Sequence, residues 1–370
     1  MIPGVSVMFH PDRPIGETAD LAAEAERLGY EGVWVSDSQS IFRDVFAALT
    51  LVAERTSRIT IGTGVTNPLS RHPAVIAGAI GSIAEHAGGR PVVLGIGTGE
   101  TAVEDLGRKR ATIARMEETA RVIRALNAGE PVTHAGAELT QRWTAPHVPI
   151  VFASSGPRSL RAAGRTADGV YLKLGVHPDV LRYALANVAA GRAETGRSLD
   201  DFRVQAMIPV AVDDDPAVAR DEVRGFAASI ARAAARAIPA EDLPEEIAAP
   251  IAELERVSSQ ARARQSYVQW LHSPEYAALI PDMIVDRFAI AGTGEQVAER
   301  ISALGAAGIT EVIPPLTMAD VRPTLRRIGT SSGMTPAPIL SSAGRGSGIA
   351  SGAITSVTPA APRPAIRSAT

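Results

Sequence analysis

The sequence of 370 residues contains no cysteine, which excludes disulfide bonds, thiolate metal sites and cysteine nucleophiles. It contains no uninterrupted apolar run of about 18 residues, so we expect no membrane-spanning helix. The chain does not start with a basic segment followed by an apolar one, and we therefore predict a cytoplasmic protein. Only two of the 37 basic residues are lysines, Lys109 and Lys173, and no basic stripe is present. A small-molecule partner is expected, and a nucleic-acid partner is not.

The 45% of hydrophobic residues provide for a large core, and they are arranged in apolar runs that alternate with helical segments. Strands that alternate with helices are typical of a parallel sheet. Eight such units favour an α/β fold of the (β/α)8 barrel type, a TIM barrel, over a doubly wound sheet. The eight predicted strands cover residues 5–9, 32–36, 59–65, 91–97, 148–153, 169–174, 202–212 and 311–316.

Two segments depart from this repeat. Residues 213–290 are rich in Ala, Arg and Glu, and they predict a helical insertion between the seventh and eighth strands of a barrel domain that covers residues 1–325. The spacing of Thr293 and Gln296 is that of a capping box, which predicts the start of the next helix. Residues 331–370 consist mainly of small residues and proline, and such a composition cannot offset its ordering entropy, so we predict a disordered tail.

The functional side chains of such a barrel lie at the carboxyl ends of the strands and in the loops that follow them. Most of the unusual residues of the sequence fall at these predicted positions. No spacing of histidines and carboxylates indicates a metal site, and no Gly-x-Ser-x-Gly motif indicates a hydrolase. The segments that follow the first six predicted strands include 9–11, 37–44, 62–73, 95–100, 153–158 and 173–177.

Several of these residues allow a structural interpretation beside a functional one. Asp37 could cap the next helix. Gly95-x-Gly97-x-Gly99 is followed by Glu100 where a dinucleotide fingerprint requires glycine, so a tight turn competes with a nucleotide loop. Residues 154–156 (SSG) could cap a helix or hold a phosphate, and His72 could be a solvated loop histidine. Glu100 is the best acid–base candidate, because burial in a barrel mouth raises the pKa of a carboxyl group.

The segments 62–75 (GTGVTNPLSRHPAV) and 94–100 (LGIGTGE) resemble the bacterial luciferase-like superfamily, as do 88–90, 153–157, 167–169 and 290–295. Within it, the chain is most similar to methylenetetrahydromethanopterin reductase and its relatives that use the deazaflavin coenzyme F420. The resemblance extends over about residues 1–320. It implies a (β/α)8 barrel, usually dimeric, with an insertion before the last strand and a flavin or deazaflavin at the carboxyl end.

The resemblance also implies site residues. In the deazaflavin branch, a non-proline cis peptide bond at the end of the third strand backs the ring, and the matching bond is Gly64–Val65. A substrate site is implied at Arg43, Arg71 and His72, together with the insertion. The resemblance implies ring contacts from Asp37, Asn67, Gly97, Thr98, Gly99 and Glu100, contacts to the ribityl-phosphate side from Ser154, Ser155 and Gly156, and a pocket lining that includes Gly175 and Val176.

One position departs from the family pattern. Many members have Asp-His after the second strand, where the histidine donates a proton in some of them, and this chain has Asp37-Ser38. A serine hydroxyl is not an acid near neutral pH, so the role passes to Glu100, to another group or to water, with Glu100 and Asp37 as the catalytic candidates. We expect an F420-dependent oxidoreductase that reduces a C=N, C=C or C=O bond.

Two other functions remain open at this point. The first is an FMN-dependent monooxygenase that obtains reduced flavin from a partner reductase. The second is a protein that binds flavin or F420 without catalysis, because a shared fold does not guarantee turnover.

Overall fold

The first and last strand runs of the chain lie side by side and close the sheet. β1 (Gly4–Val5) and β2 (Val7–Phe9) form one run, and β13 (Glu311–Ile313) and β14 (Pro315–Leu316) form another. β1 pairs with β13 and β2 with β14 in one continuous parallel register.

The computed structural model describes residues 2–261, 277–278, 280–316 and 321–331.

Within the described residues, every pairing in this sheet is parallel, and the strands follow one another in chain order around it. The predicted (β/α)8 barrel is therefore confirmed. The six strand runs between the first and the last are β3 (Gly32–Val35), β4 (Thr60–Thr63), β5 (Val92–Ile96), β8 (Ile150–Ala153), β9 (Gly169–Leu172) and β10 (Arg203–Met207).

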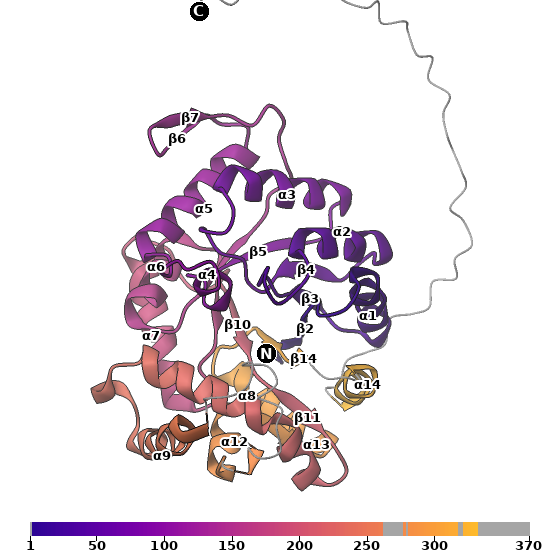
Figure 1. Ribbon diagram of the computed structural model, residues 1–370, viewed down its shortest axis with the longest axis vertical. Helices are drawn as coiled ribbons and strands as arrows, with labels where there is room; N and C mark the ends of the chain where they lie inside the picture. Colours follow the sequence, from indigo (N-terminus) through magenta and orange to yellow (C-terminus); the bar gives the residue numbers. More distant parts are fainter. Residues whose placement is uncertain (1, 262–276, 279, 317–320, 332–370) are drawn as a thin grey trace, which may run out of the picture. The chain divides into compact units, whose positions relative to one another are not determined.

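Helices surround the strands (Figure 1), and their starting points carry ordinary start signals. Proline occupies the first turn of three of them, where its missing N–H costs nothing. The predicted capping box of Thr293 and Gln296 is present. The surrounding helices are α1 (Ile15–Leu28), α2 (Val45–Arg55), α3 (Pro73–His86), α5 (Ile113–Asn127), α6 (Pro157–Thr166), α7 (Pro178–Ala193), α13 (Gly294–Ala306) and α14 (Val321–Ser331).

Two small elements interrupt this alternation. A short helix, α4 (Thr101–Glu104), follows β5, and an antiparallel hairpin of β6 (Val132–His134) and β7 (Ala137–Leu139) projects beyond α5 and α3 (Figure 1). None of the helices in the described ranges is long and apolar enough to cross a membrane.

The predicted seventh strand, 202–212, is wrong as a single element. β10 ends at Met207, and β11 (Val210–Val212) leaves the barrel to pair in parallel with β12 (Ile290–Gly292). Pro209 lies at the break, and because it has no N–H to donate, it cannot continue the ladder of the barrel sheet.

The segment between β11 and β12 is helical where it is described. It contains α8 (Pro216–Ala237), a 3-10 turn over Ala240–Asp242, α9 (Glu245–Ala261) and α12 (Asp282–Phe288). These helices gather at one end of the view in Figure 1.

The division into a domain over 1–325 and a tail from 331 stays a prediction, because α14 runs on to Ser331 and residues 332–370 lie outside the described residues.

The interior of the barrel is filled in two layers below the carboxyl end. At the amino end, the buried carboxylate of Glu311 accepts hydrogen bonds from Ser6, from Trp34 Nε1 (2.9 Å) and from Gln205 Nε2 (2.6 Å). Above this polar layer lies an apolar one, and the space above that is the candidate site. The apolar layer consists of Met8, Trp34, Val93, Val151, Tyr171 and Ile313.

Candidate active site

A cavity of about 430 Å³ opens at the carboxyl ends of the barrel strands. Its walls come from the loops after β2, β3, β4, β5, β8 and β9, and from the end of α8 in the insertion. This volume lies within the usual range of small-molecule sites. Ten of the predicted site residues line it, namely Asp37, Gly64, Val65, Asn67, Gly97, Thr98, Gly99, Glu100, Ser154 and Ser155.

The peptide bond between Gly64 and Val65 is cis, as the resemblance predicted. It lies directly after β4, where the backbone N–H of Thr66 donates to the carbonyl oxygen of Gly95 (2.9 Å). Gly64 lies close to the interior layer, since an added Cβ would meet Met8 Cε at 2.7 Å. Val65 lines the wall of the cavity.

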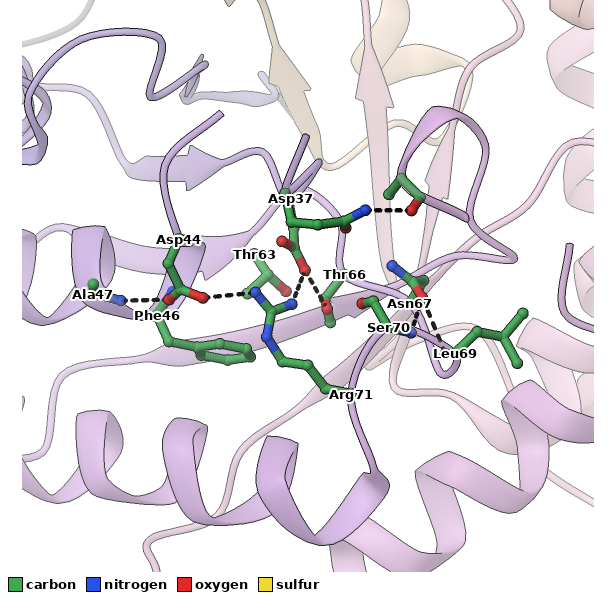
Figure 2. A network of polar contacts seen from close by, with 12 residues as sticks. Asp37, Asp44, Phe46, Ala47, Thr63, Thr66, Asn67, Leu69, Ser70 and Arg71 are labelled. Atoms are coloured by element: carbon green, nitrogen blue, oxygen red, sulfur yellow. Dashed lines mark hydrogen bonds and ion pairs between the residues drawn. The ribbon is translucent and has the colours of Figure 1, made fainter. Parts of the chain in front are cut away.

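Asp37 is the central polar group of this wall (Figure 2), and its side chain is only 1% exposed. Its Oδ2 accepts a hydrogen bond from the Thr66 hydroxyl (2.7 Å) and forms an ion pair with Arg71. Its Oδ1 is buried and has no hydrogen-bond partner among the described residues. Asp37 does not cap α2, because Asp44 does so, and the capping interpretation of Asp37 is wrong. One acceptor atom of a buried carboxylate is thus left for a ligand.

Arg71 lies behind Asp37 and joins it to Asp44, as Figure 2 shows. Its second nitrogen donates to Asp44 Oδ2 (2.7 Å), and its guanidinium carbon lies 5.1 Å from the centre of the Phe46 ring. Burial alone lowers the pKa of Arg71, but the two carboxylates raise it above its usual value. The guanidinium therefore stays charged and fixes the orientation of Asp37 from outside the cavity.

Asn67 presents a hydrogen-bond donor to the cavity, whereas Asp37 presents an acceptor. Its Oδ1 accepts hydrogen bonds from the backbone N–H groups of Leu69 (3.0 Å) and Ser70 (2.8 Å), which assigns the orientation of the amide. Its Nδ2 is buried and has no acceptor among the described residues. Asp37 and Asn67 together leave one acceptor and one donor unsatisfied in the cavity wall.

The loop after β5 is a tight turn, which agrees with the structural interpretation of its glycines. Gly99 has a φ of +78°, and a Cβ there would meet Val103 Cγ2 at 2.2 Å, so only glycine fits. The next residue, Glu100, is 51% exposed and pairs with Arg110 (3.3 Å) at the rim. The burial on which its choice as an acid–base group was based is therefore absent.

The segment 154–156 does not cap α6 through its side chains. Gly156 occupies the N-cap position without a side-chain hydrogen bond, and the Ser154 hydroxyl donates to the carbonyl oxygen of Ser159 (3.1 Å) instead. The capping interpretation therefore holds for Gly156 alone, and Ser154 and Ser155 both line the cavity.

Six predicted site residues do not line the cavity, and three of them pack against helices of the insertion. Gly175 packs on α12, where a Cβ would meet Phe288 Cδ1 at 2.5 Å, and the backbone N–H of Val176 donates to the Arg287 carbonyl oxygen (2.9 Å). Gly156 packs under the end of α8, with an added Cβ 3.1 Å from the Ala237 oxygen.

The other three belong to the predicted substrate site. Arg71 lies behind Asp37, and Arg43 is exposed and donates to the backbone oxygen of Asp12. His72 caps α3 through its Nδ1, which accepts from Ala74 N (3.1 Å). His72 is therefore an exposed capping residue of the loop, as its structural interpretation held.

The cavity also contains residues that were not selected from the sequence. His10 directly follows a predicted strand, and Lys173 lies at the end of another, so both could have been chosen by the rule that selected Asp37. The His10 ring lies 5.1 Å from that of Phe42. Arg110 follows α4, and Arg236 lies on the last turn of α8 in the insertion, where no strand end marks them.

A family model described as luciferase-like monooxygenase matches residues 2–311, and the chain therefore belongs to this family. A 5,10-methylenetetrahydromethanopterin reductase of Methanolobus tindarius is 31% identical over 318 residues, which cover 83% of this chain and 92% of the relative. An F420-dependent glucose-6-phosphate dehydrogenase of Nakamurella multipartita is 32% identical over 283 residues, 70% of this chain and 79% of the relative.

The solved structures contain the same fold. The coenzyme F420-dependent tetrahydromethanopterin reductase of Methanopyrus kandleri aligns with a TM-score of 0.75 over 90% of this chain and 98% of that chain. At 23% sequence identity, this likeness concerns the fold alone.

Proposed function

We propose that the chain is an F420-dependent oxidoreductase that transfers a hydride between the deazaflavin and a C=N, C=C or C=O bond of a small molecule. Two relatives above 30% identity support this proposal, because the printed name of one contains F420 and the other is a reductase of the same family. The observation that carries it is the pair of unsatisfied buried atoms in the cavity wall, Asp37 Oδ1 and Asn67 Nδ2.

These two atoms fit the edge of a deazaflavin ring. The pyrimidine edge of the ring has an N–H donor between two carbonyl acceptors. Asp37 Oδ1 can accept from the N–H, and Asn67 Nδ2 can donate to a carbonyl. Without such a ligand, each buried atom costs about 1–3 kcal/mol of unmet hydrogen bonding, so the wall is prepared for a ligand of this polarity.

When bound, reduced F420 supplies the hydride. The chain contributes orientation and a dry wall. Arg71 and Thr66 hold Asp37 in place, and the apolar side chains of Met8, Val65 and Met207 exclude water from the floor of the cavity.

Glu100 and His10 are the two cavity residues that can supply the accompanying proton in place of the missing family histidine. Tyr171 also lines the cavity but is unsuitable, because burial and the nearby Glu311 raise its pKa well above the usual value. Glu100 lies at the rim, and His10 is the only histidine among the described residues that line the cavity. A Glu100→Gln or His10→Gln variant that loses turnover while it keeps cofactor affinity identifies the donor, and the matching limb of the pH–rate profile disappears with it.

We further expect, from the resemblance, a homodimer, a cytoplasmic location and a separate enzyme that supplies the reduced cofactor.

FMN is the alternative cofactor. A monooxygenase that uses FMN would consume oxygen when reduced FMN is supplied, and this behaviour separates the two functions.

An anaerobic binding titration tests the proposal. The purified protein is titrated with F420 and with FMN, each oxidised and reduced. We expect tighter binding of F420 by at least about tenfold, or about 1.4 kcal/mol. Tighter binding of reduced FMN would replace the proposal by the monooxygenase, and binding of neither would remove it. Binding of F420 without oxidation of it by any of a panel of imines, enones and ketones would favour a protein that only binds the cofactor.

A further inference from the structure

The charges of the cavity wall are not balanced. Five lysine, arginine and acidic side chains line it, and two pairs of opposite charge account for three of them: Asp37 pairs with Arg71 behind the wall, and Glu100 pairs with Arg110 at the rim. The remaining two are cations. Within the described residues, the side chains of Lys173 and Arg236 have no ion pair or hydrogen bond.

The two cations approach the same corner of the cavity. Lys173 directly follows β9, whose Tyr171 pairs with Ala153 of β8, so that Lys173 stands level with Ser155 in the neighbouring loop. Arg236 precedes Ala237, whose carbonyl oxygen packs against Gly156, the residue after Ser155. The loop after β8 thus lies next to the chain at both the half-buried Lys173 and the exposed Arg236.

We infer that Lys173 and Arg236 form an anion-binding pair that holds a phosphate or carboxylate group of the molecule in the cavity. A half-buried ammonium group without a counter-charge is costly, and an anion that accepts from it and from a guanidinium group removes this cost. The anion has two possible sources: the phosphate of the cofactor or an acidic group of the substrate. The first source rests on the proposed function, whereas the binding of a free anion does not.

Two variants and two matched controls test the pair. Lys173→Gln and Arg236→Gln each remove one cation. Lys109→Gln, which changes the other lysine of the chain, and Arg142→Gln remove exposed cations that do not line the cavity. Each protein is titrated with F420, with the ribityl deazaflavin that lacks the phosphate, and with inorganic phosphate, by fluorescence or calorimetry. The phosphate titration is done with and without saturating ribityl deazaflavin or F420.

If the pair holds the phosphate of the cofactor, each variant lowers the affinity for F420 by about tenfold and leaves the affinity for the ribityl deazaflavin unchanged. If the pair holds an acidic substrate, both deazaflavins bind as before, and the affinity of the loaded protein for inorganic phosphate falls by about tenfold. Equal behaviour of the variants and the two controls in all titrations would overturn the inference. If the wild-type protein binds no deazaflavin, the proposed function fails. The anion-binding pair is then still tested by comparing the phosphate affinity of the unloaded variants with that of the unloaded controls.

Discussion

The two ends of the barrel interior each contain a buried carboxylate, and the two carboxylates are bonded differently. At the amino end, both oxygens of Glu311 accept hydrogen bonds, from Ser6 and Trp34 on one and from Gln205 on the other. At the carboxyl end, Asp37 uses only Oδ2, and its Oδ1 has no partner among the described residues. The same kind of group therefore closes one end of the barrel and leaves the other end open to a ligand.

The difference separates stability from function. A carboxylate bonded on both oxygens contributes to the fold whether or not a ligand is present. A carboxylate with one free oxygen carries a cost that only a ligand with a donor group removes. Mutations at the two ends should therefore change different measured quantities, and three predictions follow this division.

The largest expected effect is on stability at the amino end. Glu311→Ala leaves buried donors of Trp34 and Gln205 without an acceptor, and we expect it to lower the free energy of unfolding by about 3 kcal/mol. Thermal and urea unfolding measure this loss. At a temperature where the variant is folded, its F420 affinity should stay within about twofold of the wild type, equivalent to less than about 0.5 kcal/mol. A large loss of affinity in the folded variant would contradict the separation.

The second effect is on binding at the carboxyl end. Asp37→Asn places an amide where its N–H₂ group faces either Arg71 or the cavity, and both arrangements oppose a donor, so we expect F420 affinity to fall by at least about tenfold. Asp44→Asn is the matched control: it changes the other carboxylate on Arg71, outside the cavity, and asparagine still caps α2. Equal losses in both variants would show that the charge on Arg71, and not the free oxygen, determines binding.

The smallest effect concerns pH and again the amino end, where Glu26 on α1 accepts from the backbone N–H groups of residues 57–59. Burial raises the pKa of Glu26, but these hydrogen bonds lower it below its usual value. Its stabilisation is therefore complete above about pH 5 and is lost as the pH falls through the lowered pKa. Glu26→Gln should lower stability by at most about 1 kcal/mol at pH 7.

The melting temperatures of Glu26→Gln and the wild type should converge as the pH falls below about 4. A difference that persists at low pH would mean that the three hydrogen bonds do not depend on the charge of Glu26. F420 binding at pH 7 is expected to be the same in both proteins.

The barrel was predictable because buried parallel strands and their helices leave a regular alternation in the sequence. The strand over 202–212 was predicted wrongly although Pro209 marks its break, since a proline inside a run argues against one continuous central strand. The boundary between the insertion and the barrel could not be predicted without β12, because β11 pairs with residues 80 positions later, as Val210 does with Ile290.

The site was predictable where it follows the ends of strands and not where it depends on packing. Asp37 was found by its position, but its pairing with Arg71 needs the fold that brings the two loops together. Arg236 lies on a helix of the insertion and carries no local signal. Gly175 was assigned to the pocket because of its loop, whereas its contact with Phe288 shows that the glycine is needed for close packing against α12.

The parallel pair of β11 and β12 lies outside the barrel and holds the two ends of the helical insertion next to each other. The insertion therefore leaves and rejoins the chain at one place, and its length can change without moving a barrel strand. Because α8 of this insertion also forms part of the cavity wall, a change within the insertion can reshape the cavity while the register of the barrel strands is kept.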